Sequence, residues 1–333
     1  MKKLRIVLLT TILIGTVAMT GFFLYGQSVP ELPYSSFVMS PLDTLTTKTI
    51  QLIDGRTLAF EEYGRPTGIP VFYFHGGQES RLSAAFMNEQ ARKLGLRIIS
   101  PDRPGIGLST FQKDRSLTDY PSDIIQLADS LNIGTFRVIG LSGGGPHALA
   151  CAHALPHRVL KVAIVSGAAP YSYKGKLKGA WFPIKLVHWF AASDNDKNLR
   201  GFMEREQKAI LEKPQKRLKQ LQLYLPKPDR QLLREYPDYG IGFIKGSQEA
   251  FRQGIEAVVQ EWKLYVRDWG FELEEIQQPV TLWYGASDKM TPVYRGRYLH
   301  GVLPNSSLLI REDQGHFSLI RNHLDEILQE LKE

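Results

Sequence analysis

The chain has 333 residues, of which 43% are hydrophobic and 23% are charged, so it can bury a full core and is neither disordered nor collagen-like. Its 41 Lys and Arg against 34 Asp and Glu give a net charge of +7, which by itself fits a nucleic-acid partner, an anionic membrane surface or mere solubility. The single cysteine, Cys151, excludes an intrachain disulfide, a Cys-rich zinc site and a CxxC redox pair.

The first 26 residues predict a membrane anchor. Three basic residues among the first five precede an uncharged stretch, 6–26, that is long enough to cross about 30 Å of hydrocarbon as a helix. No Lys or Arg follows until Lys48, so the positive-inside rule places the N-terminus in the cytosol and the remaining chain outside. The alternative is a cleaved signal peptide and a secreted protein. Residues 27–45 contain several Pro and Ser and are interpreted as a linker.

From residue 46 onward, the pattern alternates between strands and helices. The predicted strands are 47–53, 57–63, 71–74, 97–100, 136–141, 160–165, 280–284 and 307–311. The predicted helices are 82–94, 120–131, 147–155, 294–303 and a final one that begins at Phe317. Short apolar strands separated by helices favour a mostly parallel sheet covered on both faces. The Asp54-Gly55 turn between the first two strands predicts a hairpin, which adds antiparallel strands at one edge.

The interval 171–254 has no comparable strand and is predicted to be a helical insertion, which leaves 46–170 and 255–333 as the core. From 171 to 236, ten Lys and five Arg stand against three Asp and four Glu, a local net charge of +8. These basic side chains are either solvated or face an anionic lipid surface. Because these basic residues lie on an insertion in a domain that is predicted to lie outside the cytosol, we expect no nucleic-acid partner. The insertion's aromatic side chains either pack on the sheet domain or line an acyl pocket: Trp181, Phe182, Trp189, Phe190 and Phe202.

The segment from Gly140 to Gly144 reads Gly-Leu-Ser-Gly-Gly and matches G-x-S-x-G. It falls between a predicted strand and a predicted helix, which is the context that a nucleophile elbow requires. A serine on such a sharp turn has a strained backbone, and the flanking glycines avoid clashes while the hydroxyl projects beyond the strand end. Ser142 is therefore the candidate nucleophile.

A serine hydroxyl near neutral pH needs a base to take its proton, and the base needs a third group to orient it. Asp288 follows the predicted strand 280–284, and His316 follows the last predicted strand. Loops that leave the same edge of a parallel sheet can converge, so these two residues are the candidate acid and base. Two alternatives stay open: Asp288 as the N-cap of a helix near Pro292, and Asp313 as the acidic residue beside the histidine.

Taken together, residues 46–331 resemble the α/β-hydrolase superfamily with a cap inserted after the sixth strand. Five features carry the resemblance in order: His75-Gly76-Gly77, the segment 102–109 (Asp-Arg-Pro-Gly-Ile-Gly-Leu-Ser), the serine elbow, Gly285 to Asp288, and Gly315-His316. The resemblance implies an α/β fold with a doubly wound, mostly parallel, eight-stranded sheet.

The same resemblance implies roles for individual residues. Ser142 would be the nucleophile, His316 the general base and then acid, and Asp288 the carboxylate that orients the histidine. The backbone N–H groups of Gly77 and Gly143 would form the oxyanion hole. Asp102 and Arg103 are expected to tie a loop near the active site.

A serine at position 142 disfavours the dehalogenases and epoxide hydrolases of this fold, which need a carboxylate nucleophile. No HExxH motif or carboxylate cluster with ligand spacing supports a metal, and we expect no cofactor. The sequence thus predicts a membrane-anchored serine hydrolase of the carboxylesterase or lipase type, acting on a lipid or another apolar ester. The alternatives are C–C bond hydrolysis or acyl transfer by the same three residues, and a ligand-binding protein with negligible turnover.

Overall fold

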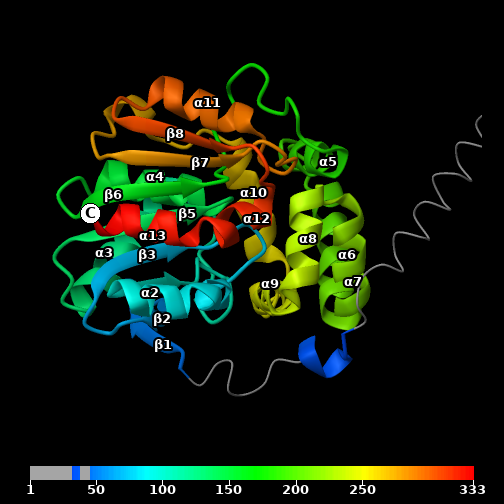
Figure 1. The fold of residues 1–333 in the computed structure, drawn as a ribbon, viewed down its shortest axis with the longest axis horizontal. Helices are drawn as coiled ribbons and strands as arrows, with labels where there is room; N and C mark the ends of the chain where they lie inside the picture. The colour runs from blue at the N-terminus through cyan, green and yellow to red at the C-terminus, as the bar shows by residue number, and fades with distance from the viewer. Residues whose placement is uncertain (1–31, 38–45) are drawn as a thin grey trace, which may run out of the picture.

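The computed structural model describes residues 32–37 and 46–333, and these contain one eight-stranded sheet (Figure 1). The order across the sheet is β1-β2-β4-β3-β5-β6-β7-β8. Strand β2 pairs antiparallel with β1 and β4, and all other neighbours are parallel. This confirms the predicted fold class. The strands are β1 (Lys48–Gln51), β2 (Thr57–Gly64), β3 (Ile69–Phe74), β4 (Leu96–Pro101), β5 (Phe136–Leu141), β6 (Val159–Val165), β7 (Val280–Gly285) and β8 (Ser306–Arg311).

Helices cover both faces of this sheet. They are α2 (Asn88–Leu94), α3 (Tyr120–Ser130), α4 (Gly144–Ala154), α11 (Val293–Val302), α12 (His316–Asn322) and α13 (Leu324–Lys332), with short 3₁₀ turns η3 (Arg81–Met87), η4 (Leu117–Asp119) and η5 (Leu273–Glu275). An apolar core lies on each face of the sheet, and successive side chains of β3 point into alternate cores. Phe72 and Phe74 pack with α3, α4 and α11, whereas Val71 and Tyr73 pack with η3, α2 and α13. Buried strands of this kind read as continuous apolar runs.

The predicted helix 82–94 is divided in the structure into the 3₁₀ turn η3 and the α-helix α2. The buried residues of η3 are Arg81, Ala84 and Met87, which are spaced by three. A 3₁₀ helix has three residues per turn and places this spacing on one face, whereas an α-helix would rotate the third residue away. The burial of these three side chains therefore accounts for the local winding.

Between β6 and β7, the chain forms six helices that lie beyond the carboxyl ends of the central strands (Figure 1). They are α5 (Phe182–Ala191), α6 (Lys197–Glu212), α7 (Pro214–Tyr224), α8 (Lys227–Glu235), α9 (Pro237–Ala250) and α10 (Glu256–Val266). We call α5 to α9 the cap. The short turn η1 (Tyr34–Phe37) lies within the predicted linker, and Phe37 is buried against cap side chains that include Leu218 and Leu233. Leu32 and Pro33 precede this turn, and the linker residues 27–31 and 38–45 lie outside the described part of the chain.

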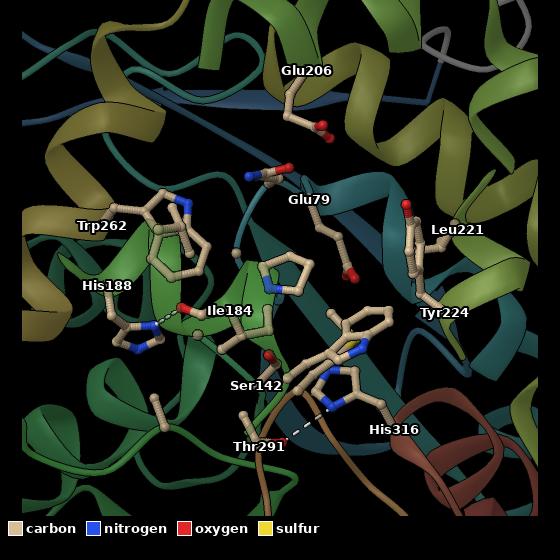
Figure 2. Close-up of a pocket in the computed structure, with 18 of the residues that line it drawn as sticks. Glu79, Ser142, Ile184, His188, Glu206, Leu221, Tyr224, Trp262, Thr291 and His316 are labelled. Atoms are coloured by element: carbon tan, nitrogen blue, oxygen red, sulfur yellow. Dashed lines mark hydrogen bonds between the residues drawn. The ribbon is translucent and has the colours of Figure 1, made fainter. Parts of the chain in front are cut away.

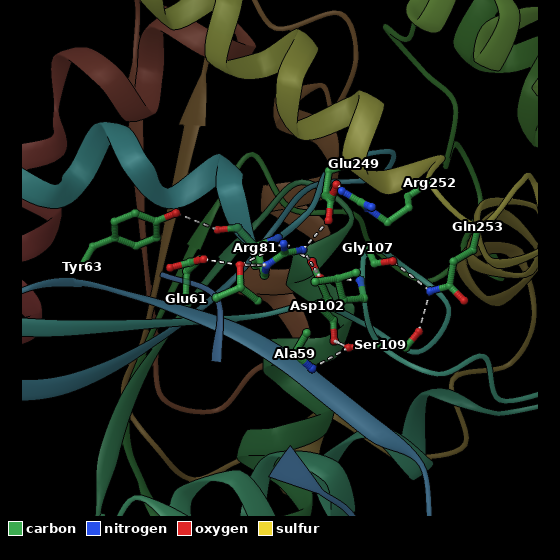
Figure 3. Close-up of polar contacts among 12 residues, drawn as sticks. Ala59, Glu61, Tyr63, Arg81, Asp102, Gly107, Ser109, Glu249, Arg252 and Gln253 are labelled. Carbon is green, nitrogen blue, oxygen red and sulfur yellow. Dashed lines mark hydrogen bonds and ion pairs between the residues drawn. The ribbon is translucent and has the colours of Figure 1, made fainter. Parts of the chain in front are cut away.

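A buried arginine joins the cap to the sheet domain (Figure 3). Arg81 Nη1 lies 2.6 Å from Asp102 Oδ2, at the end of β4, and 2.7 Å from Glu249 Oε1 of cap helix α9. Asp102 Oδ1 also accepts a hydrogen bond from the Arg81 backbone N–H at 2.7 Å. One guanidinium thus holds two carboxylates, one from each part of the fold, away from water.

The predicted anchor at residues 1–26 lies outside the described residues. Within 32–37 and 46–333, the structure contains no helix with the length and apolar character needed to cross a bilayer.

Candidate active site

Ser142 sits where β5 turns sharply into α4, with a backbone φ of 51°. Its N–H donates to Val165 O at 2.9 Å, which fixes the turn against the next strand. The two outer glycines of the motif are required by close packing. A Cβ at Gly144 would lie 2.0 Å from Phe74 O, and one at Gly140 would lie 2.8 Å from Ala148 Cβ. The motif thus forms the strained elbow that the sequence predicts.

The loops after β7 and β8 bring Asp288 and His316 together. His316 Nδ1 lies 2.8 Å from Asp288 Oδ2, and the Thr291 hydroxyl donates to the same oxygen at 2.8 Å. The other carboxylate oxygen accepts the backbone N–H groups of Met290 and Thr291 at 2.7 and 2.9 Å. Asp288 therefore stabilises the turn before α11 and also orients the histidine. The N-cap of α11 itself is Pro292, and no side chain caps that helix. Asp313, the rival acid, is exposed.

Burial and charge act in opposite directions on this pair. Burial disfavours the imidazolium, but attraction and hydrogen bonding from Asp288 outweigh it and raise the pKa of His316 above its ordinary value. Burial likewise opposes the charged form of Asp288, but His316 and the Thr291 hydrogen bonds lower the pKa of Asp288 below its usual value. Because Nδ1 faces the carboxylate, Nε2 is the nitrogen left for a proton from Ser142, which lines the same cavity.

The expected oxyanion donors lie close together. An ideal Cβ at Gly143 would be 2.9 Å from Gly77 N and 2.3 Å from the Tyr265 hydroxyl, so the two glycine backbones approach each other beneath that ring. Arg103 holds the loop that carries Gly77, as its Nη1 and Nη2 donate to His75 O and Gly76 O at 2.6 and 2.8 Å. This is the loop-tying contact expected of Arg103.

A buried carboxylate in turn holds that arginine. Glu261 of α10 lies 2.8 Å from Arg103 Nε, forms an ion pair with Arg115 and accepts the Tyr265 hydroxyl at 2.8 Å. Its two oxygens therefore accept hydrogen bonds from Arg115 and Tyr265 and form an ion pair with Arg103. No local sequence pattern indicates these roles of Glu261 and Tyr265, which lie more than a hundred residues beyond the loop that they support.

Asp229, on cap helix α8, is another residue whose role at the site no local sequence pattern indicates. Its carboxylate accepts the backbone N–H groups of His316, Phe317 and Ser318 at 2.8, 3.1 and 2.8 Å, and the Ser318 hydroxyl at 2.8 Å. These groups open helix α12, whose first N–H groups have no partner within the helix. A carboxylate from the cap therefore caps the helix that carries the candidate base.

A cavity of about 420 Å³ lies between the cap and the strand ends. Ser142, Gly143, Gly77 and His316 line it from the sheet domain, and the cap supplies mostly apolar side chains (Figure 2). The aromatic residues of the insertion divide into three groups. Trp181 and Phe202 line the cavity, Phe190 packs in an apolar cluster of the cap, and Phe182 and Trp189 are 64% and 54% exposed. Two of the five aromatic residues therefore line the cavity, and its role as an acyl pocket stays a prediction.

Three histidines near the elbow do not line this cavity. His75 and His147 are fully buried, and burial, with the charge of Arg103 as the second cause, lowers the pKa of both well below the ordinary value. His153 lies 2.8 Å from Glu275 at the surface. Within the described residues, no group of three His, Cys, Asp or Glu side chains is placed to hold a metal ion.

Comparison with known proteins agrees with this architecture. The sequence model of the alpha/beta hydrolase fold matches residues 69–322. The chain therefore belongs to the α/β-hydrolase family of enzymes, and the predicted resemblance is confirmed.

Three individual relatives share between 20% and 34% of the aligned residues with this chain. An uncharacterized hydrolase, YcgS, of Bacillus subtilis is 34% identical over 106 residues, which is 32% of this chain and 36% of that protein. The poly(3-hydroxyalkanoate) depolymerase of Ectopseudomonas oleovorans is 25% identical over 82% of this chain and 87% of its own. A thermophilic esterase of Thermogutta terrifontis superposes with a TM-score of 0.62 at 20% identity, covering 86% of this chain and 99% of the esterase. The chain thus spans little more than a third of the first of these curated relatives.

Proposed function

We propose that this chain is a serine hydrolase that cleaves carboxylic esters through an acyl-enzyme on Ser142. The observation that carries the proposal is the convergence of four loops: the strained elbow after β5 with Ser142 and Gly143, the loop after β3 with Gly77, and the loops after β7 and β8 that pair Asp288 with His316. Ser142, Gly77, Gly143 and His316 line one cavity. The name of the depolymerase relative agrees with hydrolytic chemistry.

The reaction follows from this arrangement. Ser142 Oγ attacks the ester carbonyl carbon while His316 Nε2 takes the hydroxyl proton, and the backbone N–H groups of Gly77 and Gly143 stabilise the oxyanion. The C–O bond to the alcohol breaks, and the alcohol leaves with the proton from His316. Water then attacks the acyl carbon while His316 takes its proton. The bond between the acyl carbon and Ser142 Oγ breaks, His316 returns the proton to Oγ, and the carboxylic acid leaves. Asp288 holds the imidazole in the required tautomer throughout.

A fluorophosphonate probe tests the nucleophile directly. We expect covalent labelling of the wild type and none of Ser142→Ala, with a loss of kcat on the order of 10⁶-fold toward 4-nitrophenyl esters. Ser193→Ala, which alters an exposed cap serine, is the matched control and should label like the wild type. A folded wild type that takes no label, yet binds an ester in the cavity, would identify a binding protein instead.

A series of 4-nitrophenyl esters from acetate to palmitate then reports the acyl length that the cavity accepts. Because the cap lining is largely apolar, we expect turnover to rise beyond acetate. A preference for acetate throughout the series would contradict an apolar acyl substrate.

We also propose that residues 1–26 anchor the enzyme with its catalytic domain outside the cytosol. The uncharged stretch after three basic residues supports this, and the +8 of the insertion and the exposed Phe182 and Trp189 suit an anionic lipid surface. Full-length protein should resist carbonate extraction from membranes, and its catalytic domain should be cleaved by protease added outside. An N-terminus of the mature protein beyond residue 26 would show secretion instead. Binding to anionic liposomes should fall with added salt.

A further inference from the structure

Four arginines are buried in the described part of the chain, and three of them are paired with carboxylates. Arg81 holds Asp102 and Glu249, while Arg103 and Arg115 share Glu261. The fourth, Arg295 at the start of α11, is 4% exposed and forms no ion pair with any described carboxylate. Its Nε has no hydrogen-bond partner among the described residues. Arg295 lines the same cavity as Ser142 and His316.

Within the described residues, the side chain that forms a hydrogen bond with Arg295 is that of His188, which cannot neutralise it. His188 Nδ1 lies 2.7 Å from Ile184 O (Figure 2) and therefore donates its proton there. This leaves Nε2 to accept from Arg295 Nη2 at 3.2 Å. Burial, reinforced by the charge of Arg295, lowers the pKa of His188 to about 3, so this imidazole is neutral at pH 7. His188 thus orients the guanidinium and leaves its charge in place.

Nearby acidic groups are already engaged. Both oxygens of Asp288 are used by His316, Thr291 and Met290, as described above. Glu206, on the cap side of the cavity, pairs with Arg217 at 2.7 Å. A buried cation without a counter-ion lowers the stability of the fold by several kcal/mol. Proteins retain such a cation where a ligand supplies the opposite charge. Burial itself lowers the pKa of Arg295, which expresses the same cost.

We propose that Arg295 is the carboxylate-binding subsite of this cavity, and that the preferred esters carry a free carboxylate separated from the scissile bond by an apolar segment. A guanidinium binds a carboxylate with two parallel hydrogen bonds. A single arginine beside a neutral histidine matches one negative charge, which favours a carboxylate over a doubly charged phosphate. Ile184, Val187 and Ala168 line the same cavity and suit the apolar segment. This inference rests on the proposed ester hydrolysis and adds the substrate class.

The test compares anionic and neutral esters of equal acyl carbon number. Mono-4-nitrophenyl adipate and suberate are paired with 4-nitrophenyl hexanoate and octanoate. A carboxylate on the alcohol side is probed by 4-acetoxybenzoate against its methyl ester. We expect the wild type to favour the anionic member of at least one pair by tenfold or more in kcat/KM, equivalent to about 1.4 kcal/mol.

The variant Arg295→Met should lower the ratio of kcat/KM for the anionic ester to kcat/KM for the neutral ester at least tenfold. Arg295→Lys keeps the charge but lacks the two-pronged geometry, so it should retain part of the preference and serves if the methionine variant fails to fold. The matched control is Lys289→Met, which removes an exposed charge next to Asp288 and should change the ratio less than twofold.

The outcomes separate this inference from the proposed function. Turnover of neutral esters with no anionic preference in any pair, or a preference that survives Arg295→Met, overturns the subsite and leaves ester hydrolysis intact. If neither class is hydrolysed, ester hydrolysis fails, and calorimetry still tests the subsite. Monomethyl adipate should then bind Ser142→Ala at least tenfold more tightly than it binds the Ser142→Ala, Arg295→Met double variant. Equal affinities would overturn the subsite.

Discussion

Replacing Asp229 should lower both the free energy of unfolding and the pKa of His316, although Asp229 belongs to the cap. Its Oδ1 accepts Phe317 N, Ser318 N and the Ser318 hydroxyl, and its Oδ2 accepts His316 N. In Asp229→Asn the amide oxygen can keep the first three bonds, but the amide nitrogen then faces the His316 N–H. One buried donor is left unpaired, and we expect a loss of about 2 kcal/mol. Asp229→Ala removes every acceptor and should cost about 4 kcal/mol.

The asparagine variant also has an electrostatic consequence. After the dominant effects of burial and of Asp288, the Asp229 charge contributes to raising the pKa of His316. Removing it should lower that pKa, so the acid limb of kcat/KM should move to lower pH. A merely structural role for Asp229 would leave the limb where it is.

Urea unfolding and pH–rate profiles with a 4-nitrophenyl ester measure these two effects. Asp194→Asn is the control, since it makes the same change at an exposed cap position and should alter stability by less than about 0.5 kcal/mol. The reasoning is refuted if Asp229→Asn unfolds like the wild type and its acid limb is unchanged.

Two further predictions concern the base and the elbow. The proposed reaction requires a neutral His316 as base, and Asp288 raises the pKa of His316 against the effect of burial. We therefore expect kcat/KM to fall on acidification with a midpoint above about 6.5. Undiminished activity at pH 5 would contradict a histidine base. Gly144→Ala places a Cβ 2.0 Å from Phe74 O and should cost about 3 kcal/mol and abolish fluorophosphonate labelling. Gly301 is exposed on α11, and a Cβ added there would meet no atom within 4 Å outside its own helix. Gly301→Ala should therefore leave stability unchanged or raise it by up to about 1 kcal/mol. Urea unfolding of both variants measures this contrast.

The sequence could predict those parts of the site that local backbone chemistry encodes. The Ser142 elbow depends on neighbouring glycines, and Asp288 and His316 each follow an apolar strand at one edge of a parallel sheet. The parallel sheet itself followed from the alternation of strands and helices, and the structure confirms it.

The supporting residues could not be predicted in this way. Asp229 meets His316 from 87 positions away, and Glu261 meets Arg115 from 146 positions away. Such contacts depend on how an insertion packs onto the core, which no local pattern specifies. Net charge was equally uninformative about Arg295, because counting charges does not separate a paired arginine from an unpaired one.

The junction at Arg81 constrains how substrate reaches Ser142. Arg81 binds Glu249 of α9 to the sheet domain, and Asp229 of α8 binds the start of α12, so two cap helices are fastened by buried charges. Lifting these helices would strand charged groups without partners, which is costly. We expect the entrance to open at α6 and α7 instead, which lie on the outer side of the cap in Figure 1, while α8 and α9 stay in place.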